Sequence, residues 1–596
     1  MASVLATVQR YLYIGNDVPF FFDVTEPLDI ELGKKVLAPA VKPQPLTPAV
    51  NGASKRSKKV PKLKNVEPAP KGEQTRNETS GSLTTIPVPP VLALIKKILR
   101  VQTVRRLDEC LFALAYCSRE LPTVEERHSV YAELPELLSG SHELFVFLEY
   151  YTRLATQSGY AGFGHGLRGA ITRWYDKYGA LELAAIVASS NSVEGWSHAD
   201  VIRKTHLKLA CPAKQAVIDA ATKRTSQLVS YIALRSAEKK DPEKANENGA
   251  IMDALNRYRT LREIRGAPSA VETVEYINKH GAITFELIPK QFRRSVKVWE
   301  ALFPHLTYRE LLAAALPMMD FSVLKTSDSS ITKAYINALS DRRKAIEKEK
   351  INAIEVHDIV KLFSNLRRYK SKLKEKQQRE KKNTNIIPPF DIFNMLDEIA
   401  DYSLSHHPKT GARYYIALDL RRAHLKKHVL RSCIVECIEA SALMAFSIFK
   451  REKNVTVVAF AEDEKSLRPV EFRQDMTWSQ ALKHCKDMVL PKTKAKLTMP
   501  IQNAQTNKQE VDVFITITDS LVRINPLRSA PAEALLEYRK AMNLNLTRYV
   551  AVSLCYHKPS LEFNENSMKT GGILELVGYN ASNAKLIEAF AKNLFF

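Results

Sequence analysis

The chain has 596 residues, and its 88 Lys and Arg against 65 Asp and Glu give a formal net charge of +23. Hydrophobic residues make up 45% and charged residues 26%, a composition typical of globular proteins that excludes collagen-like, mucin-like and wholly disordered chains. No stretch approaches the roughly 20 apolar residues of a membrane span. The excess of positive charge favours polyanionic partners, although charge alone is equally typical of a solvated surface.

The N-terminus and the cysteines bear on localisation. Arg10 interrupts the first apolar stretch, which argues against a signal peptide. The seven cysteines are scattered and form no CxxC pair, so neither a disulfide framework nor a structural zinc site is predicted. We therefore expect a soluble protein in a reducing compartment, the cytoplasm, and leave open an additional nuclear fraction.

The first domain boundaries follow from composition. Residues 1–38 contain an apolar patch and are expected to pack on the domain that follows. Residues 39–90 are rich in Pro, Lys, Ser and Thr and have almost no aromatic residues, so they predict a disordered insertion. Its basic cluster, residues 55–59, is read as a nuclear address, a loose RNA contact or part of a solubilising linker.

Residues 91–401 show helical periodicity almost throughout, and we predict an α-solenoid of consecutive helix pairs. Ser197 is predicted to cap a helix that starts at His198, and a long helix follows Pro212. Later helices are expected at 268–280, 289–303, 307–316 and 341–370. The basic run at 366–382 reads as an exposed helix end before the linker, residues 402–412.

Residues 413–596 change character. Short apolar runs rich in β-branched residues alternate with helical patterns, which predicts a doubly wound α/β domain. The expected strands are 414–420, 455–460, 512–519 and 547–555, and the expected helices are 424–450, 477–488, 532–542 and 582–595. The fold class is therefore multidomain, an α-helical repeat domain followed by an α/β domain.

Two predicted strands end in carboxylates, Asp419 and Asp519, at the sheet edge where α/β domains bind ligands. A von Willebrand A metal site would require Asp-x-Ser-x-Ser, but Arg421 and Ala423 replace both serines, and the stretch expected to carry its threonine, 491–498, is basic. We expect Arg421 to pair with both aspartates. No cofactor is predicted, with a divalent cation such as Mg²⁺ as the alternative.

Other candidate chemistry is weaker. His424 and His428 are spaced for a shared helix face, but they lack a third ligand and are expected to be surface histidines. The glycine-rich stretch at 162–166 follows a helix rather than a strand, so it predicts a turn and not a phosphate loop. We find no catalytic motif and expect no enzyme activity.

The stretch 160–208 interleaves basic residues with aromatic residues and histidines, a combination typical of RNA-binding surfaces. Trp174 and Trp196 are interpreted as core residues of amphipathic helices. The candidate RNA contacts are Arg168, Arg173, Lys177, His198, Arg203, Lys204, His206 and Lys208.

Several of these motifs resemble one family. LFALAYCS (111–118), HGLRGAITRWY (165–175) and GWSHADVIRKTHLK (195–208) resemble the TROVE domain of the sixty-kilodalton SS-A/Ro ribonucleoprotein family. RYLYIGNDVPFFF (10–22) is similar to that family's N-terminal strand segment. A von Willebrand A-like domain after a TROVE domain is the same architecture, so the resemblance covers most of the chain.

The resemblance implies a ring of HEAT-like helical repeats closed by a von Willebrand A-like domain. It also implies small non-coding Y RNAs on the outer surface and misfolded RNAs whose single-stranded 3′ ends enter the central hole. His206 corresponds to the family's RNA-contacting histidine, and Arg168 would line the same surface. One departure is that residues 188–194 carry no basic side chain, where the family usually has Lys and Arg.

We therefore expect an RNA-binding protein, the core of a small ribonucleoprotein that acts in RNA quality control. Its partners would be small structured RNA, misfolded RNA ends and RNA-processing proteins that bind the von Willebrand A-like domain, with no membrane. The alternative is a protein-interaction scaffold that has lost specific RNA recognition. A metal-dependent hydrolase at Asp419 and Asp519 is a third interpretation.

Overall fold

The structure is a computed structural model. It describes residues 2–21, 27–41, 89–101, 106–159, 162–222, 242–280, 285–324, 326–365, 389–406, 408–463, 466–491, 493–521, 529–563 and 571–595. The predicted disordered insertion, apart from its first and last residues, and the predicted basic helix end at 366–382 lie outside the described residues.

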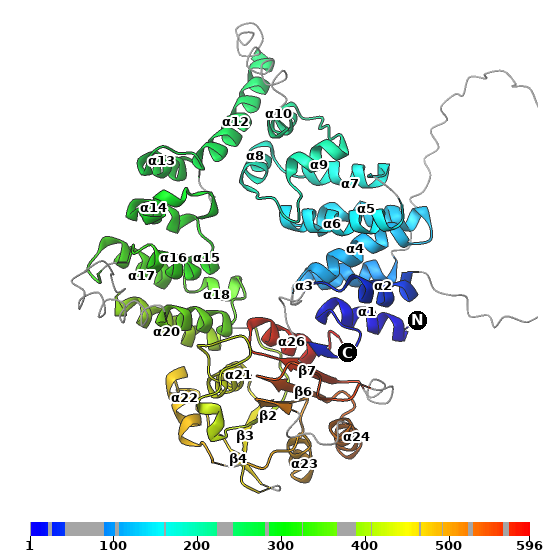
Figure 1. The fold of residues 1–596 in the computed structure, drawn as a ribbon, viewed down its shortest axis with the longest axis vertical. Helices are drawn as coiled ribbons and strands as arrows, with labels where there is room; N and C mark the ends of the chain where they lie inside the picture. The colour runs from blue at the N-terminus through cyan, green and yellow to red at the C-terminus, as the bar shows by residue number, and fades with distance from the viewer. Residues whose placement is uncertain are drawn as a thin grey trace, which may run out of the picture.

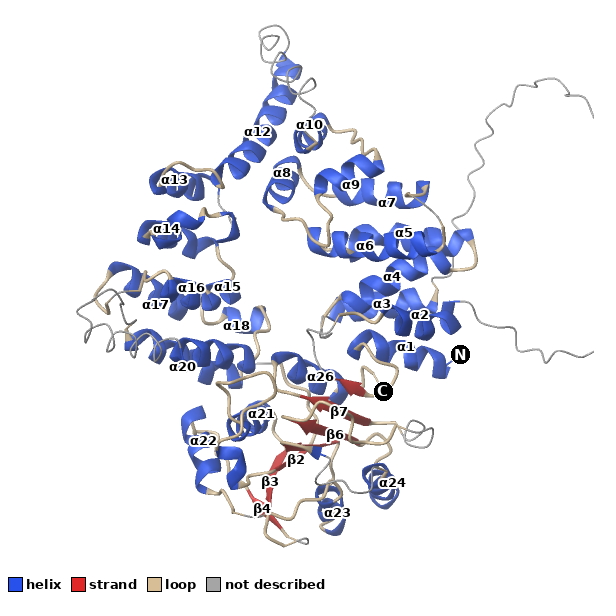
Figure 2. Cartoon of the chain, viewed as in Figure 1, coloured by secondary structure: helices blue, strands red, loops and turns tan. Residues whose placement is uncertain are grey.

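Helices dominate the first four hundred residues (Figure 2). The α-helices there are α1 (Ala2–Ile14), α2 (Ile30–Val41), α3 (Pro90–Val101), α4 (Asp108–Glu120), α5 (Val124–Leu137), α6 (Ser141–Gln157), α7 (His165–Asp176), α8 (Ala180–Ser189), α9 (His198–Thr205), α10 (Pro212–Ala221), α12 (Pro242–Ile264), α13 (Ala270–His280), α14 (Val296–Leu302), α15 (Tyr308–Ala313), α16 (Ala315–Asp320), α17 (Ser330–Asp341), α18 (Ala345–Lys348) and α20 (Phe390–Ser405). Residues 353–365 are also helical.

These helices form two columns that rise from the C-terminal domain and are joined at the top by α12 (Figure 1). The first column runs from α1 to α10, and α12 packs on α8 and α10 before it meets α13. The second column runs through α14 and α17 to α20, which contacts the C-terminal domain. Each helix mainly buries its apolar face against its neighbours, as expected of a helical-repeat solenoid, and the solenoid closes into a ring.

Local sequence signals define many helix starts. Capping boxes begin α5 at Thr123, α9 at Ser197 and α15 at Thr307, where the side-chain oxygen accepts a backbone N–H of the first turn. Each such cap typically stabilises a helix by about 1 kcal/mol. The predicted start at Ser197 is thereby confirmed, and Pro212 is the first residue of α10 as the sequence predicts.

The C-terminal domain is an α/β sandwich. Its helices are α21 (Cys437–Arg451), α22 (Trp478–Asp487), α23 (Met499–Thr506), α24 (Ala530–Met542) and α26 (Ala581–Ala591). Its strands are β2 (Tyr414–Leu418), β3 (Val455–Phe460), β4 (Leu467–Pro469), β5 (Val513–Thr518), β6 (Arg548–Ser553) and β7 (Ile573–Val577). The four predicted strands are all present as β2, β3, β5 and β6.

Among the described residues the sheet has seven strands in the order β1-β7-β6-β5-β2-β3-β4, where β1 is Phe20–Phe21. All neighbours are parallel except β3 and β4. Since β2 and β5 are adjacent and parallel, their carboxyl ends meet at one edge of the sheet. This is the position at which the strand order reverses and where doubly wound domains bind ligands.

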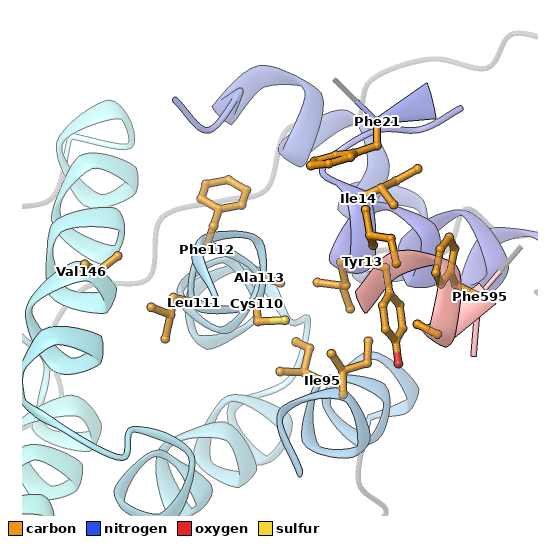
Figure 3. Packing of buried hydrophobic residues seen from close by; sticks show 14 of the residues in the cluster. Tyr13, Ile14, Phe21, Ile95, Cys110, Leu111, Phe112, Ala113, Val146 and Phe595 are labelled. Carbon is orange, nitrogen blue, oxygen red and sulfur yellow. The ribbon is translucent and has the colours of Figure 1, made fainter. Parts of the chain in front are cut away.

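The N-terminal segment joins the two domains, which the sequence did not predict. Helix α1 packs on α3 and α4 of the helical column, whereas β1 pairs with β7 at the edge of the C-terminal sheet. Tyr13 stacks on Phe595 with ring centroids 4.8 Å apart, so both ends of the chain share one apolar core (Figure 3). The ring is therefore held closed on this side by residues that are far apart in sequence.

Three boundaries differ from the predictions. Helix α2 continues to Val41, so the ordered N-terminal segment extends past residue 38. Helix α21 begins at Cys437 and not at residue 424, because residues 422–425 form only a 3₁₀ turn. Helix α20 continues to Ser405, so the linker predicted at 402–412 begins later than expected. Strand β1 lies within the strand segment expected at 10–22, whereas helix α17 and strands β4 and β7 were missed. Within the described residues no helix is long and apolar enough to cross a membrane.

Candidate functional site

Helices α7 and α9 contact each other and carry most of the predicted RNA contacts. Residues 162–164 are non-helical, as expected of the turn predicted at 162–166, but His165 and Gly166 already belong to α7. Gly166 lies against Tyr131 of α5, and a Cβ at this position would come within 2.6 Å of the Tyr131 ring. Only glycine therefore allows α7 to pack this closely on α5.

Six of the eight candidate residues are exposed: Arg173, Lys177, Arg203, Lys204, His206 and Lys208. Three of them have protein partners. Lys177 Nζ donates to the carbonyl of Pro135 at 2.6 Å, Arg173 Nη2 donates to the carbonyl of Tyr131 at 3.0 Å, and Arg203 Nη1 lies 3.6 Å from Asp200 Oδ1.

The remaining cations are not neutralised. Within the part of the chain that the structure describes, no carboxylate pairs with Arg168, Lys204 or Lys208. His206 ends α9 in the left-handed backbone conformation (φ 51°), and its side chain is exposed beside these lysines. The surface formed by Arg168, Lys204, His206 and Lys208, called the α7–α9 surface below, therefore presents positive charge that is available to a polyanion.

His198 does not belong to this surface, and its predicted RNA contact is wrong. The side chain is buried, with Nδ1 2.7 Å from the Tyr175 hydroxyl and Nε2 3.0 Å from Ser141 Oγ. Burial lowers the pKa of His198 to about 3, so the imidazole is neutral near pH 7. Trp174 and Trp196 are also buried, which confirms their interpretation as core residues.

The segment without basic residues, 188–194, receives a cation from another helix. The Arg265 guanidinium, just beyond α12, donates through Nη2 to Asn191 Oδ1 at 2.7 Å and to the carbonyl of Ser189 at 3.3 Å. Arg265 is exposed and lies 74 residues from Asn191 in the sequence. No local motif marks it, so sequence reasoning could not have found it.

A second cluster lies where β2 and β5 end. Asp419 and Asp519 are 0% and 1% exposed, and the Arg421 guanidinium bridges them. Arg421 Nη2 is 2.6 Å from Asp419 Oδ2 and 2.6 Å from Asp519 Oδ1, while its Nε lies 2.9 Å from Asp419 Oδ1. The predicted pairing of Arg421 with both aspartates is therefore confirmed.

Further donors complete this ion-pair cluster. Lys427 Nζ is 2.7 Å from Asp519 Oδ2, and Thr518 Oγ1 donates to Asp419 Oδ2 at 2.9 Å. Burial by itself raises the pKa of Asp519, but the His424 and Lys427 side chains and the charge of Arg421 outweigh it, so this pKa lies well below its usual range. Asp519 is therefore held in its charged form by neighbouring cations.

His424 was predicted to lie on a surface helix, and this is wrong. It is fully buried in the 3₁₀ turn Arg422–Leu425, with Nε2 3.5 Å from Asp519 Oδ1 and 3.8 Å from Asp419 Oδ2. His428 is exposed, as expected. The four-residue spacing of His424 and His428 wrongly indicated a shared helix face, because residues 422–425 form only a 3₁₀ turn and α21 begins later, at Cys437.

The donor set does not suit a divalent cation. Asp419, His424 and Asp519 each offer one atom within 4.8 Å of the others, a spacing that a metal ion would need. However, the Arg421 guanidinium and the Lys427 ammonium already occupy oxygens of both carboxylates. Thr493 supplies a hydroxyl 3.4 Å from Asp419 Oδ1, but Ala423 has no ligand atom. A cation would have to displace two protein charges, so the residues do not fit the group.

The architecture of this chain is a ring of paired helices closed by a C-terminal α/β domain of the von Willebrand A (vWA) kind (Figure 1). The family model described as the Ro60 vWA domain matches residues 413–591. The chain is 22% identical over 487 residues to "RNA-binding protein RO60" of Caenorhabditis elegans, covering 77% of this chain and 71% of the relative. It is 22% identical over 497 residues to the protein of the same name from Deinococcus radiodurans, covering 83% of each.

A comparison of structures shows a shared fold. The crystal structure of the Deinococcus radiodurans RO (RSR) protein matches with a TM-score of 0.73 at 18% identity, covering 99% of this chain and 100% of that one. The resemblance to the Ro60 family is thereby confirmed: the chain is similar in sequence to Ro60 proteins over most of its length, and its fold matches that of the RO (RSR) protein.

Proposed function

We propose that this chain is an RNA-binding protein and forms the core of a small ribonucleoprotein. The observation that carries the proposal is the α7–α9 surface, where Arg168, Lys204 and Lys208 have no carboxylate partner among the described residues. The two curated relatives that cover most of the chain are both named RNA-binding proteins, which supports the same function.

The mechanism is electrostatic capture. Lysine and arginine on the α7–α9 surface neutralise phosphates and release their counterions, which makes affinity depend steeply on salt. Arg265 supplies a cation to the 188–194 segment, where basic residues are missing. Structured RNA suits such a surface because its phosphates and 2′-hydroxyls are read by shape.

The finer proposal concerns which RNA is bound. Small non-coding, Y-like RNA would lie on the α7–α9 surface, and misfolded RNA would be recognised through its single-stranded 3′ end for quality control in the cytoplasm. RNA-processing proteins would contact the vWA domain.

We further propose that the protein has no catalytic activity of its own. Asp419 and Asp519 are the buried carboxylates that would serve a hydrolytic site, and their oxygens accept from Arg421 and Lys427. Carboxylates held in this way are poor general bases because their oxygens already accept from fixed cations, and the pKa of Asp519 is in addition well below its usual range. The vWA domain then contributes a rigid closing element to the ring.

The test is ultraviolet crosslinking in the protein's own cells, followed by sequencing of the attached RNA. One abundant small structured RNA would support a dedicated ribonucleoprotein. A mixed set of aberrant RNAs with free 3′ ends would support surveillance without a dedicated partner. No RNA above background would overturn the proposal.

A second candidate is a protein-interaction scaffold, favoured by the absence of basic side chains from the 188–194 segment. Glu194 in this segment pairs with Arg153 at 3.7 Å, so the segment itself offers no cation to a phosphate. The salt dependence of RNA binding separates the two functions, because a scaffold with incidental RNA affinity would show a flat slope.

A further inference from the structure

A cavity of about 300 Å³ opens between α6, α7 and α9 on the α7–α9 surface. Its lining includes Tyr151, Thr152 and Thr156 of α6, Phe163 before α7, Arg168 of α7 and Lys204 of α9. A volume of this size is at the lower end of the range of small-molecule pockets and exceeds the roughly 30 Å³ share of one water about ten-fold. The cavity can therefore hold one flat, ring-sized group.

The walls of the cavity are aromatic. The rings of Tyr151 and Phe163 meet edge to face with centroids 6.0 Å apart, and Phe163 stacks on Trp196 at 5.8 Å. This packing fixes the two lining rings, because Tyr151 and Phe163 are buried together with Trp196. Rigid aromatic faces of this kind are the surfaces on which unstacked bases bind, independent of sequence.

The rim of the cavity is cationic. Lys204 lines the cavity, and its Nζ lies 4.4 Å from the centroid of the Trp196 ring. Arg168 lines the cavity from the first turn of α7, and neither Arg168 nor Lys204 has a carboxylate partner among the described residues. The cavity thus combines positive charge with an aromatic wall.

Two buried polar atoms of the lining residues have no protein partner. Arg168 Nε and Thr152 Oγ1 are both inaccessible and lack a hydrogen-bond partner within the described part of the chain. Leaving such groups unpaired is costly, more so for a charged group, unless an occupant supplies the missing acceptor or donor. A ligand with phosphate and carbonyl oxygens provides acceptors of the required kind.

We propose that this cavity binds one nucleotide that is unstacked from single-stranded RNA, with its base against Tyr151 and Phe163 and its phosphate at Arg168 and Lys204. The inference rests on the proposed RNA-binding function and assigns to it a nucleotide subsite. The neutral hydroxyls of Thr152 and Thr156 lie in the same lining and give the base polar contacts without a fixed sequence code.

The experiment uses the full chain and an oligouridylate of about ten nucleotides, the length of an ordinary single-strand site, that carries 4-thiouridine at one position. After photo-crosslinking, mass spectrometry identifies the modified peptide. Affinity is measured in parallel over a range of salt concentrations. We expect the crosslink in the peptides that contain Tyr151 or Phe163.

Two variants distinguish the effect of the cavity volume from the effect of the positive charge that lines it. Thr156→Trp fills the cavity from the exposed end of α6 without changing charge, so it should abolish the crosslink and weaken binding at least about ten-fold with an unchanged salt slope. Arg168→Met should weaken binding similarly and lower the salt slope by about 0.7, the value for one phosphate contact to a single strand. Lys333→Met, on α17 in the other column, removes the same charge far from the cavity and should bind normally.

The outcomes are distinguishable. Tight, salt-dependent binding of the oligonucleotide with a crosslink elsewhere and normal binding by Thr156→Trp would overturn the nucleotide subsite and leave RNA binding intact. Uridine monophosphate that competes as well as the oligonucleotide at equal nucleotide concentration would overturn it in favour of a free-nucleotide site. Failure of the wild-type chain to bind both this oligonucleotide and structured RNA would overturn the proposed function itself. Circular dichroism and thermal melting confirm that each variant is folded.

Discussion

The α7–α9 surface and the ion-pair cluster of the vWA domain use the same residue types in opposite ways. Lys204 and Arg168 have no carboxylate partner among the described residues, whereas Arg421 and Lys427 are neutralised by two buried aspartates. Because these two cations and two aspartates cancel, they add nothing to the formal net charge of +23, which resides in other cations of the chain. Where a cation lies in the structure, and not how many cations the chain contains, decides whether it can bind a ligand or stabilises the fold.

The largest expected effect is on the stability of the vWA domain. Arg421→Met would leave Asp419 and Asp519 as neighbouring buried charges without their bridging guanidinium, and should lower the free energy of unfolding by about 3–5 kcal/mol. Urea denaturation measures the change. The control Arg422→Met removes an exposed arginine one residue away and should stay within about 0.5 kcal/mol of the wild type. Equal losses in both variants would contradict a structural role for the ion pair.

The next prediction concerns pH and the buried His198. Its pKa is lowered to about 3 in the folded chain, so between about pH 6.5 and pH 3 the unfolded chain binds a proton that the folded chain does not. The contribution of His198 to the free energy of unfolding should therefore fall by about 1.4 kcal/mol for each pH unit below about 6.5. Comparing urea unfolding of wild type and His198→Gln across this range isolates the effect.

The glutamine of His198→Gln has an amide that can hydrogen-bond to the Tyr175 hydroxyl, but it has no titratable group. If the difference in stability between His198→Gln and wild type does not change with pH, His198 is not buried in its neutral form. His206→Gln makes the same substitution at an exposed histidine and serves as the control, and its free energy of unfolding at pH 7 should stay within about 0.5 kcal/mol of the wild type.

A smaller effect is expected for RNA binding at the α7–α9 surface. Arg168→Ala combined with His206→Ala should weaken binding to structured RNA about ten-fold at physiological salt. It should also lower the slope of affinity against salt by the amount that corresponds to about one phosphate contact. Filter binding over a salt series provides both quantities. Unchanged affinity would exclude this surface as the RNA site and remove the contrast with the vWA domain.

The smallest effect tests whether the vWA cluster can be converted into a metal site. Restoring the hydroxyls with Arg421→Ser and Ala423→Ser should allow Mg²⁺ to raise stability by about 1 kcal/mol at ten times its dissociation constant. The wild-type chain should show no shift on adding Mg²⁺, since Arg421 and Lys427 occupy the carboxylates. Thermal unfolding with and without Mg²⁺ measures both, and a shift in the wild type would refute the ion-pair interpretation.

Part of this organisation was predictable from the sequence because its signals are local. Hydrophobic periodicity identified the helical domain, and β-branched runs identified β2, β3, β5 and β6. Every residue of β2, β5 and β6 is buried, and so are the last four residues of β3. Strand β7 was missed because Glu575 interrupts its apolar run. That carboxylate accepts the backbone N–H groups of Ser560 and Leu561, a partner that no local pattern reveals.

The candidate sites show the same difference between features that local sequence determines and features that long-range packing determines. The amino-acid sequence by itself determined that Asp419 and Asp519 follow strands and that Arg421 lies close enough to pair with them, because these relations depend on strand ends and short spacing. Only the tertiary structure decided that His198 and His424 are buried, that Arg265 reaches the 188–194 segment, and that β1 pairs with β7. The physical reason is that burial and long-range pairing depend on which surfaces meet, and that is set by closure of the whole ring.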